Sequence, residues 1–377
     1  MKVRLGDYIR EYSVRNKADE DIPVYSVTNT QGFCKDYFGK EVASKDKTTY
    51  KIVPRGYFAY NPSRINVGSV DWQREEEKVI VSPLYNVFSV AEEIEQQYLY
   101  YYLKSDITLQ RIRAVALGSV RDNLKLNMLY EFPINLPTKE EQRYVVEILD
   151  SARQVIELRK KEVDMLDDLI KARFVESFGD EDNSKKWEVV NVEDVADVQV
   201  GVVIKPSQYY TDESNGVRAF RSLNVGAGFI KDTDWVYFTQ EGHHKNSKSI
   251  LRENDLLIVR SGAPGTACVV TKKYAGYNAI DIIIVHPDCK RVNPYYLCTF
   301  TNMPHGKKQI DEGTGGAAQQ HFNVGKYSKL KLMLPPKELQ DDFADFIERV
   351  DKSKVAVQKA LDETQLLFDS LMQQYFG

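Results

Sequence analysis

Several signals that commonly identify a function are scarce or missing in this sequence of 377 residues. Its four cysteines, Cys34, Cys268, Cys289 and Cys298, form no Cys-x-x-Cys pair, so neither a zinc site nor a disulfide framework is indicated. No apolar run is long enough to cross a bilayer, and the N-terminal segment MKVRLGDYIR lacks the apolar stretch of a signal peptide. The sequence therefore predicts a cytoplasmic protein with no membrane segment.

Motifs for catalysis are missing as well. The sequence contains no Gly-x-x-x-x-Gly-Lys-Ser/Thr, the loop with which ATPases bind phosphate. Asn61-Pro62-Ser63 is the nearest approach to the Asn-Pro-Pro-aromatic motif of adenine methyltransferases, and it lacks the aromatic residue that stacks on a flipped base. His243-His244 has no Cys, Asp or Glu at a spacing that would complete a metal site. We therefore expect no catalytic residue, no metal and no cofactor in this chain.

What the sequence does contain is an internal repeat. The segment Leu136 to Gln142 returns as Leu334 to Gln340, and Phe178-Gly179 returns as Phe376-Gly377, at one shift of 198 residues (334 minus 136). The repeat predicts two globular parts, each followed by one long helix. We call these parts head 1 (residues 1–138), arm 1 (139–179), head 2 (184–336) and arm 2 (337–377).

The net charge of −4 is distributed unevenly along the chain. Residues 135–183 carry 8 Lys and Arg against 13 Asp and Glu, and residues 335–377 carry 5 against 9, so the arms account for the excess of acid. The heads are neutral to basic. This division favours heads that bind phosphate and arms that bind protein.

The arms have the heptad pattern of a coiled coil. Its apolar seam is expected at Leu149, Ile156, Val163, Leu166 and Ile170 in arm 1, and at Ile347, Val350, Val357, Leu361, Phe368 and Leu371 in arm 2. One head joins the two arms, so they can pair within one chain, and the pseudo-twofold repeat predicts that they pair antiparallel. Polar seam residues such as Arg159 and Lys354 suit control of the register. The alternative is a coiled coil that dimerises the protein.

Each head is expected to contain short strands that end in polar loops, followed by a closing helix. Strands are predicted at residues 23–27 and 56–60 in head 1 and at 217–221 and 255–259 in head 2, with closing helices at 94–114 and 293–311. Asn293 and Pro294 are typical of a helix cap and a first helical residue. The predicted fold class is therefore α+β: two globular α/β domains separated by two long helices that form an intramolecular antiparallel coiled coil.

The polar loops contain the side chains that contact bases and phosphates in other proteins. Candidates for guanine or phosphate contact are Arg64, Arg121, Arg221 and Arg260. Candidates for adenine or water-bridged contact are Asn29, Gln31, Asn61, Asn224, Gln319, Gln320 and Asn323.

The whole layout resembles the specificity subunit of type I restriction-modification systems. The resemblance rests on the twin Leu-Pro-x-Lys-Glu-x-Gln segments, the long helices after them, and two pairs of loop and strand, 118–121 with 132–137 and 319–323 with 330–335. It implies that the heads are target-recognition domains, each binding one half of a bipartite double-stranded DNA sequence, and that the coiled coil sets the gap. It also implies two methyltransferase subunits as partners, and restriction subunits recruited through them. These partners would carry S-adenosylmethionine, Mg²⁺ and ATP.

The two copies of the repeat differ at their junctions. Thr138 and Glu141 in the first copy correspond to Pro336 and Leu339 in the second, so we do not expect the two implied methyltransferase docking faces to be strictly equivalent. The alternative function is a stand-alone sequence-specific DNA-binding or scaffolding protein of the same architecture.

Overall fold

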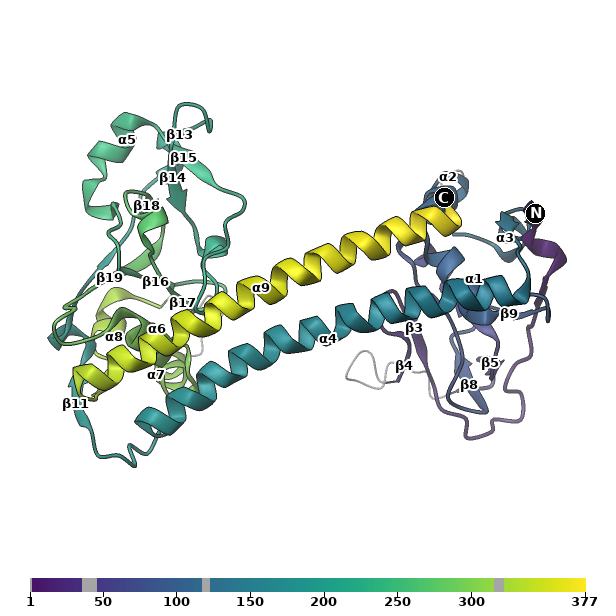
Figure 1. Ribbon diagram of the computed structural model, residues 1–377, viewed down its shortest axis with the longest axis horizontal. Coiled ribbons are helices and arrows are strands. Elements are labelled where there is room, and N and C mark those ends of the chain that lie inside the picture. The colour runs from purple at the N-terminus through teal and green to yellow at the C-terminus, as the bar shows by residue number, and fades with distance from the viewer. Residues whose placement is uncertain (1, 36–45, 117–122, 315–321) are drawn as a thin grey trace. The chain divides into compact units, whose positions relative to one another are not determined.

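The computed structural model describes residues 2–35, 46–116, 123–314 and 322–377 (Figure 1). The chain divides into two compact units. Unit 1 consists of Met1–Lys160 together with Lys359–Gly377, and unit 2 consists of Lys161–Gln358. Each unit therefore contains one head and one segment of each long helix.

The head of unit 1 is built on a four-stranded antiparallel sheet in the order β2–β9–β6–β7. Its strands are β2 (Ile9–Glu11), β6 (Phe58–Tyr60), β7 (Val70–Trp72) and β9 (Asn86–Val90). Three two-stranded ladders accompany it: β1 (Lys2–Arg4) with β10 (Pro133–Asn135), β3 (Ser26–Thr28) with β4 (Gly32–Cys34), and β5 (Lys51–Pro54) with β8 (Lys78–Val81). The helices are α1 (Gln96–Lys104), α2 (Asp106–Ala116) and α3 (Leu126–Tyr130).

The head of unit 2 repeats this scaffold and adds a second sheet. The order β12–β19–β16–β17 matches that of the sheet in unit 1, with β12 (Ala196–Val200), β16 (Leu256–Val259), β17 (Ala267–Val269) and β19 (Ile282–Pro287). Strands β11 (Glu188–Asn191) and β20 (Lys331–Leu334) pair as β1 and β10 do. The added sheet has the order β13–β15–β14–β18, from β13 (Tyr210–Thr211), β14 (Val217–Phe220), β15 (Val236–Phe238) and β18 (Asn278–Ala279). The helices are α5 (Gln240–Lys245), α6 (Pro294–Asn302), α7 (Pro304–Thr314) and α8 (Val324–Ser328).

The predicted closing helices are each broken once. Residues 94–114 form α1 and α2, separated by Ser105, and residues 293–311 form α6 and α7, separated by Met303. Pro304 disfavours a helical conformation at the preceding Met303, whose φ and ψ are −72° and 159°. The Ser105 hydroxyl accepts a hydrogen bond from the backbone N–H of Thr108 at 3.4 Å and so acts as a cap for α2. The predicted start of the second helix is confirmed, because the Asn293 side chain accepts from the N–H of Tyr295.

The two long helices are α4 (Lys139–Phe178) and α9 (Lys337–Phe376), and they pair antiparallel inside each unit. In unit 1, Arg159 donates to the Thr364 hydroxyl and to the Ala360 carbonyl. In unit 2, Lys354 forms a 2.6 Å salt bridge with Asp167. The intramolecular antiparallel pairing is thus confirmed, and polar residues of the seam find partners on the other helix. None of the helices in the described ranges combines the length and the apolar composition needed to span a membrane.

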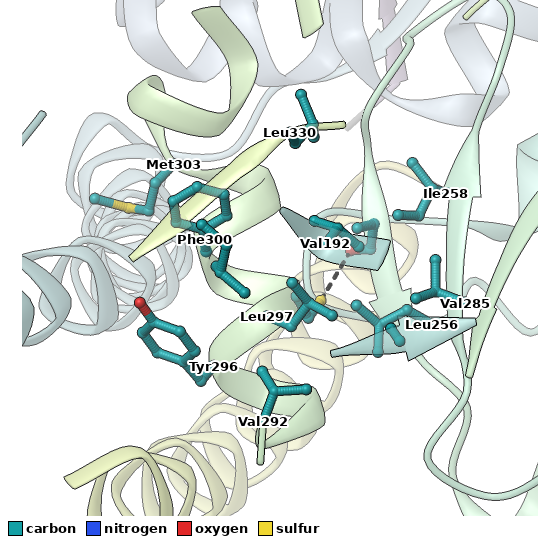
Figure 2. Close-up of a cluster of buried hydrophobic side chains, with 14 of the residues drawn as sticks. Val192, Leu256, Ile258, Val285, Val292, Tyr296, Leu297, Phe300, Met303 and Leu330 are labelled. Atoms are coloured by element: carbon teal, nitrogen blue, oxygen red, sulfur yellow. Dashed lines mark hydrogen bonds between the residues drawn. The ribbon is translucent and has the colours of Figure 1, made fainter. Parts of the chain in front are cut away.

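The core of each head includes the start of one long helix and the end of the other. In unit 1, Val145 and Leu149 of α4 and Phe376 of α9 are buried with the head, and Figure 1 shows the end of α9 beside α1 and α2. In unit 2, Phe343 of α9 and Phe178 of α4 are buried in the same way. Figure 2 shows side chains of α6, β16 and β19 meeting in this second core.

A buried glutamine fixes the start of each long helix to its head. Gln142 accepts a hydrogen bond from the N–H of Glu95 at 2.9 Å and donates to the carbonyls of Glu93 (2.9 Å) and Pro137 (3.0 Å). Gln340, 198 residues later, accepts from the N–H of Asn293 at 2.8 Å and donates to the carbonyls of Arg291 and Pro335. Both side chains are fully buried. The repeated Leu-Pro-x-Lys-Glu-x-Gln segment is therefore a structural clamp between helix and head.

Candidate nucleic-acid interface

In unit 1 the predicted DNA-contacting loops gather around one tyrosine. Asn29 and Gln31 are exposed at the tip of the β3–β4 hairpin, and Asn61 begins the loop after β6. The hydroxyl of Tyr85 hydrogen-bonds the backbone of Val27 in the hairpin and the side chain of Asn61 in the loop. Burial raises the pKa of Tyr85, and these hydrogen bonds partly offset the shift. The hairpin and the loop therefore form one surface, with Asn61 held by the fold.

Arg64 is the most available cation of this surface. Its side chain is exposed, and within the described part of the chain its guanidinium makes no hydrogen bond or salt bridge. A neighbouring cation, Arg113 of α2, is also exposed and donates from Nε to the carbonyl of Asn66 in the same loop at 3.2 Å. A free guanidinium beside exposed amides provides the donors that guanine edges and phosphates accept.

In unit 2, two segments from the predicted interface meet at Arg260, which follows β16. Its Nε donates to the carbonyl of Phe322 at 3.2 Å, and the N–H of Phe322 donates to the Arg260 carbonyl at 3.0 Å. Its Nη1 forms a salt bridge with the Asp281 carboxylate at 2.5 Å. Asn323 is exposed and caps α8 by accepting from the N–H of Lys326 at 3.0 Å. The loop after β16 and residues 322–323, directly before α8, therefore lie together.

Arg221 and Asn224 have a different environment. Asn224 is fully buried, and its amide donates to the carbonyls of Thr233 at 2.7 Å and Lys231 at 3.4 Å while it accepts from the N–H of Arg221 at 2.9 Å. The structure thus corrects the expectation for Asn224, because a side chain with these bonds shapes its loop and is not presented to a ligand. Arg221 is half-buried and donates to the carbonyl of Asp234. Arg121, Gln319 and Gln320 lie outside the described residues.

Three residues of these surfaces were not identified from the sequence. Tyr85 and Asp281 organise the loops, and Arg113 adds a cation. Tyr85 immediately precedes β9, and Asp281 immediately precedes β19, at a positive φ of 51°. Tyr85 and Asp281 each stand directly before a strand of the central sheet. An aromatic or polar residue at that position in the sequence could have been used to predict both of them.

Every residue of the predicted seam is at least half-buried on α4 and α9. The buried members are Leu149, Ile156, Ile347 and Val350, and the half-buried members are Val163, Leu166, Ile170, Val357, Leu361, Phe368 and Leu371. Outside the seam most neighbouring positions are exposed. This burial pattern is that of two helices packed along one face.

Unit 1 also has an apolar groove on the outer face of its helix pair. The groove has a volume of about 560 Å³ and is lined by Tyr144, Ile148 and Val155 of α4 and by Leu367 and Leu371 of α9. Tyr144 is 62% exposed and Leu367 is 55% exposed. Exposed apolar groups of this kind mark surfaces for protein partners.

The histidine pair of α5 is engaged in hydrogen bonds of the fold. Nδ1 of His243 lies 2.7 Å from the side-chain oxygen of Asn278, and Nδ1 of His244 lies 2.6 Å from the carbonyl of Gln240. Within the ranges that the structure describes, no three His, Cys, Asp or Glu side chains gather as metal ligands would.

Comparison with known proteins assigns the family. The family model of the type I restriction modification DNA specificity domain matches residues 5–166 and 184–364, which together make up most of the sequence. The chain therefore belongs to this family. It is a specificity subunit of a type I restriction-modification system with two target-recognition domains.

Individual relatives agree with the family assignment. The chain is 22% identical to the type I restriction enzyme MjaVIII specificity subunit of Methanocaldococcus jannaschii over 95% of its own length and 89% of the relative. It is 21% identical to the MjaIX specificity subunit of the same organism, over 74% and 68%. Among solved structures, a chain from a study of complex assembly and conformational transition of the type I R-M system has a TM-score of 0.62 at 18% identity, with 100% and 97% coverage. The type I S subunit from M. genitalium has a TM-score of 0.55 at 14% identity, with 100% and 96% coverage. These two structures share the fold of this chain.

Proposed function

We propose that this subunit recognises a bipartite double-stranded DNA target, with each head binding one half-site. The observation that carries the proposal is that two equivalent sheets present different loops. The strands β6 and β16 occupy the same place in their sheets, but β6 is followed by Asn61 and Arg64, and β16 is followed by Arg260. A shared scaffold with divergent polar loops is suited to two different half-sites.

Within each head we propose specific DNA contacts. In head 1 they are Asn29 and Gln31 at the hairpin tip and the unpaired Arg64 in the neighbouring loop. In head 2 they are Arg260 and Asn323, whose loops meet at Phe322. Arg121, Gln319 and Gln320 remain proposed contacts from the sequence alone. A bidentate contact from an arginine to guanine would discriminate bases by about 1–3 kcal/mol.

We propose that α4 and α9 set the length of the unrecognised gap between the half-sites. Each helix has 40 residues, which corresponds to about 60 Å at roughly 1.5 Å per residue. This length exceeds one turn of B-DNA, about 34–36 Å. Lengthening both helices by the same number of turns should widen the gap in the target sequence, and an unchanged gap would contradict this role of the helices.

The chain is proposed to leave catalysis to its partners. Two methyltransferase subunits would dock on the paired helices, restriction subunits would join through them, and S-adenosylmethionine, Mg²⁺ and ATP would be bound by these partners. The apolar groove of unit 1, with Tyr144 and Leu367 exposed, is suited to such docking. A complex of this kind acts on cellular DNA, so the proposed location is the cytoplasm.

The decisive experiment is to map methylated adenines across the host genome with the native subunit and with a chimera. In the chimera, residues 1–134 are replaced by the corresponding head of another specificity subunit. We expect one half of the recognised sequence to change while the other half and the gap stay the same. A change in both halves would show that the heads do not act independently.

Co-purification separates this function from a stand-alone DNA-binding or scaffolding protein. The full chain should capture a methyltransferase subunit from its host and should bind its target more tightly in that complex. A chain that binds DNA tightly but never captures a methyltransferase would support the alternative.

A further inference from the structure

Unit 2 contains a pocket that the proposed function does not use. It has a volume of about 240 Å³ and lies between the loop 227–229, helix α6 and the paired segments of α4 and α9. Apolar side chains form most of its wall, including Ile170, Ile347, Val269, Met303 and Phe229. Ligand pockets for drug-sized molecules have roughly 300–1,000 Å³, so this pocket suits a smaller molecule.

One carboxylate in this pocket makes no salt bridge of its own among the described residues, and its neighbouring cation, Lys354, is paired with another acid. Asp351 of α9 is half-buried, and among the described residues its carboxylate makes no hydrogen bond or salt bridge. Burial raises its pKa, Lys354 partly offsets this shift, and Asp167 adds to it. A desolvated carboxylate that shares its cation with another acid is costly, and a bound cation would offset that cost.

The other charges around the pocket are already paired. Lys354 forms its salt bridge with Asp167 at 2.6 Å. Lys171 of α4 forms a salt bridge with Asp168 at 2.9 Å. The lining residues contributed by α6 and by the loop 227–229 carry no charge. Asp351 is therefore the group that would select the charge of a ligand.

The equivalent place in unit 1 shows what can fill such a site. At the shift of 198 residues, Asp351 corresponds to Arg153 and Cys298 corresponds to Tyr100. The Arg153 guanidinium lies 5.9 Å from the ring centres of Tyr100 and Tyr101, and Arg74 lies 5.4 Å from the ring centre of Tyr100. Flat cations and aromatic rings thus pack together between helix and head in unit 1.

In unit 2 the same positions have lost those groups. Cys298 is much smaller than the tyrosine that it replaces, and an acid stands in place of the arginine. The result is a space lined mostly by apolar groups, in which Asp351 is the charged lining residue that makes no salt bridge among the described residues, whereas Asp167, Lys171 and Lys354 do. The groups that unit 2 lacks here are a guanidinium and an aromatic ring. A flat organic cation has the charge of the first and the flat shape of the second.

We propose that the pocket around Asp351 binds a small organic cation with a flat apolar body, of the amidinium or guanidinium class. The cation pairs with the Asp351 carboxylate, and the apolar body packs against Ile170, Ile347 and Phe229. Such a ligand contacts the loop 227–229 and both long helices of unit 2 at once. Its binding therefore stiffens the attachment of the loop to the helices.

The test is a calorimetric titration of the full chain with benzamidine, and separately with benzamide, which has the same shape but no charge. We expect saturable binding of benzamidine and at least tenfold weaker binding of benzamide. Asp351→Asn should weaken benzamidine binding at least tenfold, because it removes the charge and keeps the size. Asp351→Glu should retain most of the affinity. Asp345→Asn is the matched control, since it removes the same charge from an exposed position of the same helix and should leave binding unchanged.

Three results would overturn the proposal. The first is the absence of saturable benzamidine binding to the wild-type chain. The second is equal affinity for benzamide, which would show that charge does not select the ligand. The third is an Asp351→Asn variant that binds benzamidine as tightly as the wild type. The comparison of the two ligands on the wild-type chain holds whether or not a variant folds.

Discussion

Units 1 and 2 attach their heads to the long helices through equivalent buried residues, yet many of the exposed residues around these attachments differ. Gln142 and Gln340 make the same set of hydrogen bonds, and Phe376 and Phe178 end their helices inside the heads. The loops and the helix surfaces differ. Residues that form buried hydrogen bonds have few acceptable replacements, whereas exposed residues can change with little cost to stability.

The outer faces of the helix pairs illustrate this difference. Tyr144 and Leu371 line the apolar groove of unit 1, and their counterparts in unit 2 are Asp342 and Arg173. The guanidinium of Arg173 lies 5.8 Å from the ring centre of Phe346 and so covers this ring. The counterpart of Phe346 in unit 1 is Ile148, which lines the open groove. Two identical partner subunits would therefore meet unequal surfaces.

The largest expected effect is on the aromatic residues that end the long helices. Phe178→Ala removes a fully buried ring that lies 4.7 Å from the ring of Tyr296, and Phe376→Ala removes one that lies 5.1 Å from Tyr98. Each should lower the free energy of unfolding by about 3–5 kcal/mol, with the larger loss for Phe178 because it is more deeply buried. Denaturant titration measures the loss. Leu366→Ala, at a 70% exposed position of α9, is the control.

The second largest effect is expected for the two buried glutamines that attach the long helices to the heads. Gln142→Ala and Gln340→Ala each remove three hydrogen bonds and leave buried backbone groups without partners, which should cost about 2–3 kcal/mol. Amide exchange should accelerate at Glu95 in the first variant and at Asn293 in the second. Gln154→Ala, at an exposed position of α4, should change neither. If only one of the two substitutions lowered the stability, the two units would not be equivalent in this respect.

Substitutions in the proposed DNA-binding loops should affect DNA binding in both heads but stability in head 2 alone. Arg64→Ala should weaken binding to the correct base by about 1–3 kcal/mol without changing stability, because the guanidinium has no partner among the described residues. Arg260→Ala should reduce both DNA binding and the stability of head 2, since it leaves Asp281 and the Phe322 carbonyl without their donor. Competition binding with single-base variants, run beside thermal unfolding, separates the two cases. Equal behaviour of both variants would contradict the assignment.

The smallest effect is expected on partner docking. Leu367 of unit 1 and Leu169 of unit 2 are equivalent positions with 55% and 47% exposure. Leu367→Glu places a charge in the apolar groove and should weaken the tighter methyltransferase binding about tenfold, roughly 1.4 kcal/mol. Leu169→Glu should have less effect, because Asp342 and Arg173 already place charges on the equivalent face of unit 2. Sedimentation of the subunit with increasing methyltransferase gives both affinities.

The sequence was sufficient to predict features that depend on local patterns. The heptads of α4 and α9, the Asn293 cap and the repeat all have signals within one helix or at one fixed shift. Features that depend on tertiary neighbours were not predictable. Asn224 has the composition of a recognition residue but is buried by its own loop, and Tyr85 joins two loops that lie far apart in the sequence. The break at Ser105 also depends on one side-chain hydrogen bond that helical periodicity does not report.

The packing of Phe376 against Tyr98 and Tyr102 has a consequence for biosynthesis. Head 1 leaves the ribosome before head 2, but its core stays incomplete until residue 376 has been translated. Head 2 takes Gln340, Phe343 and Ile347 from the chain that follows it, and all three lie close to its end in the sequence. The domain made first is thus the last that can finish folding, and a nascent chain must keep its exposed aromatic surface from aggregating during that delay.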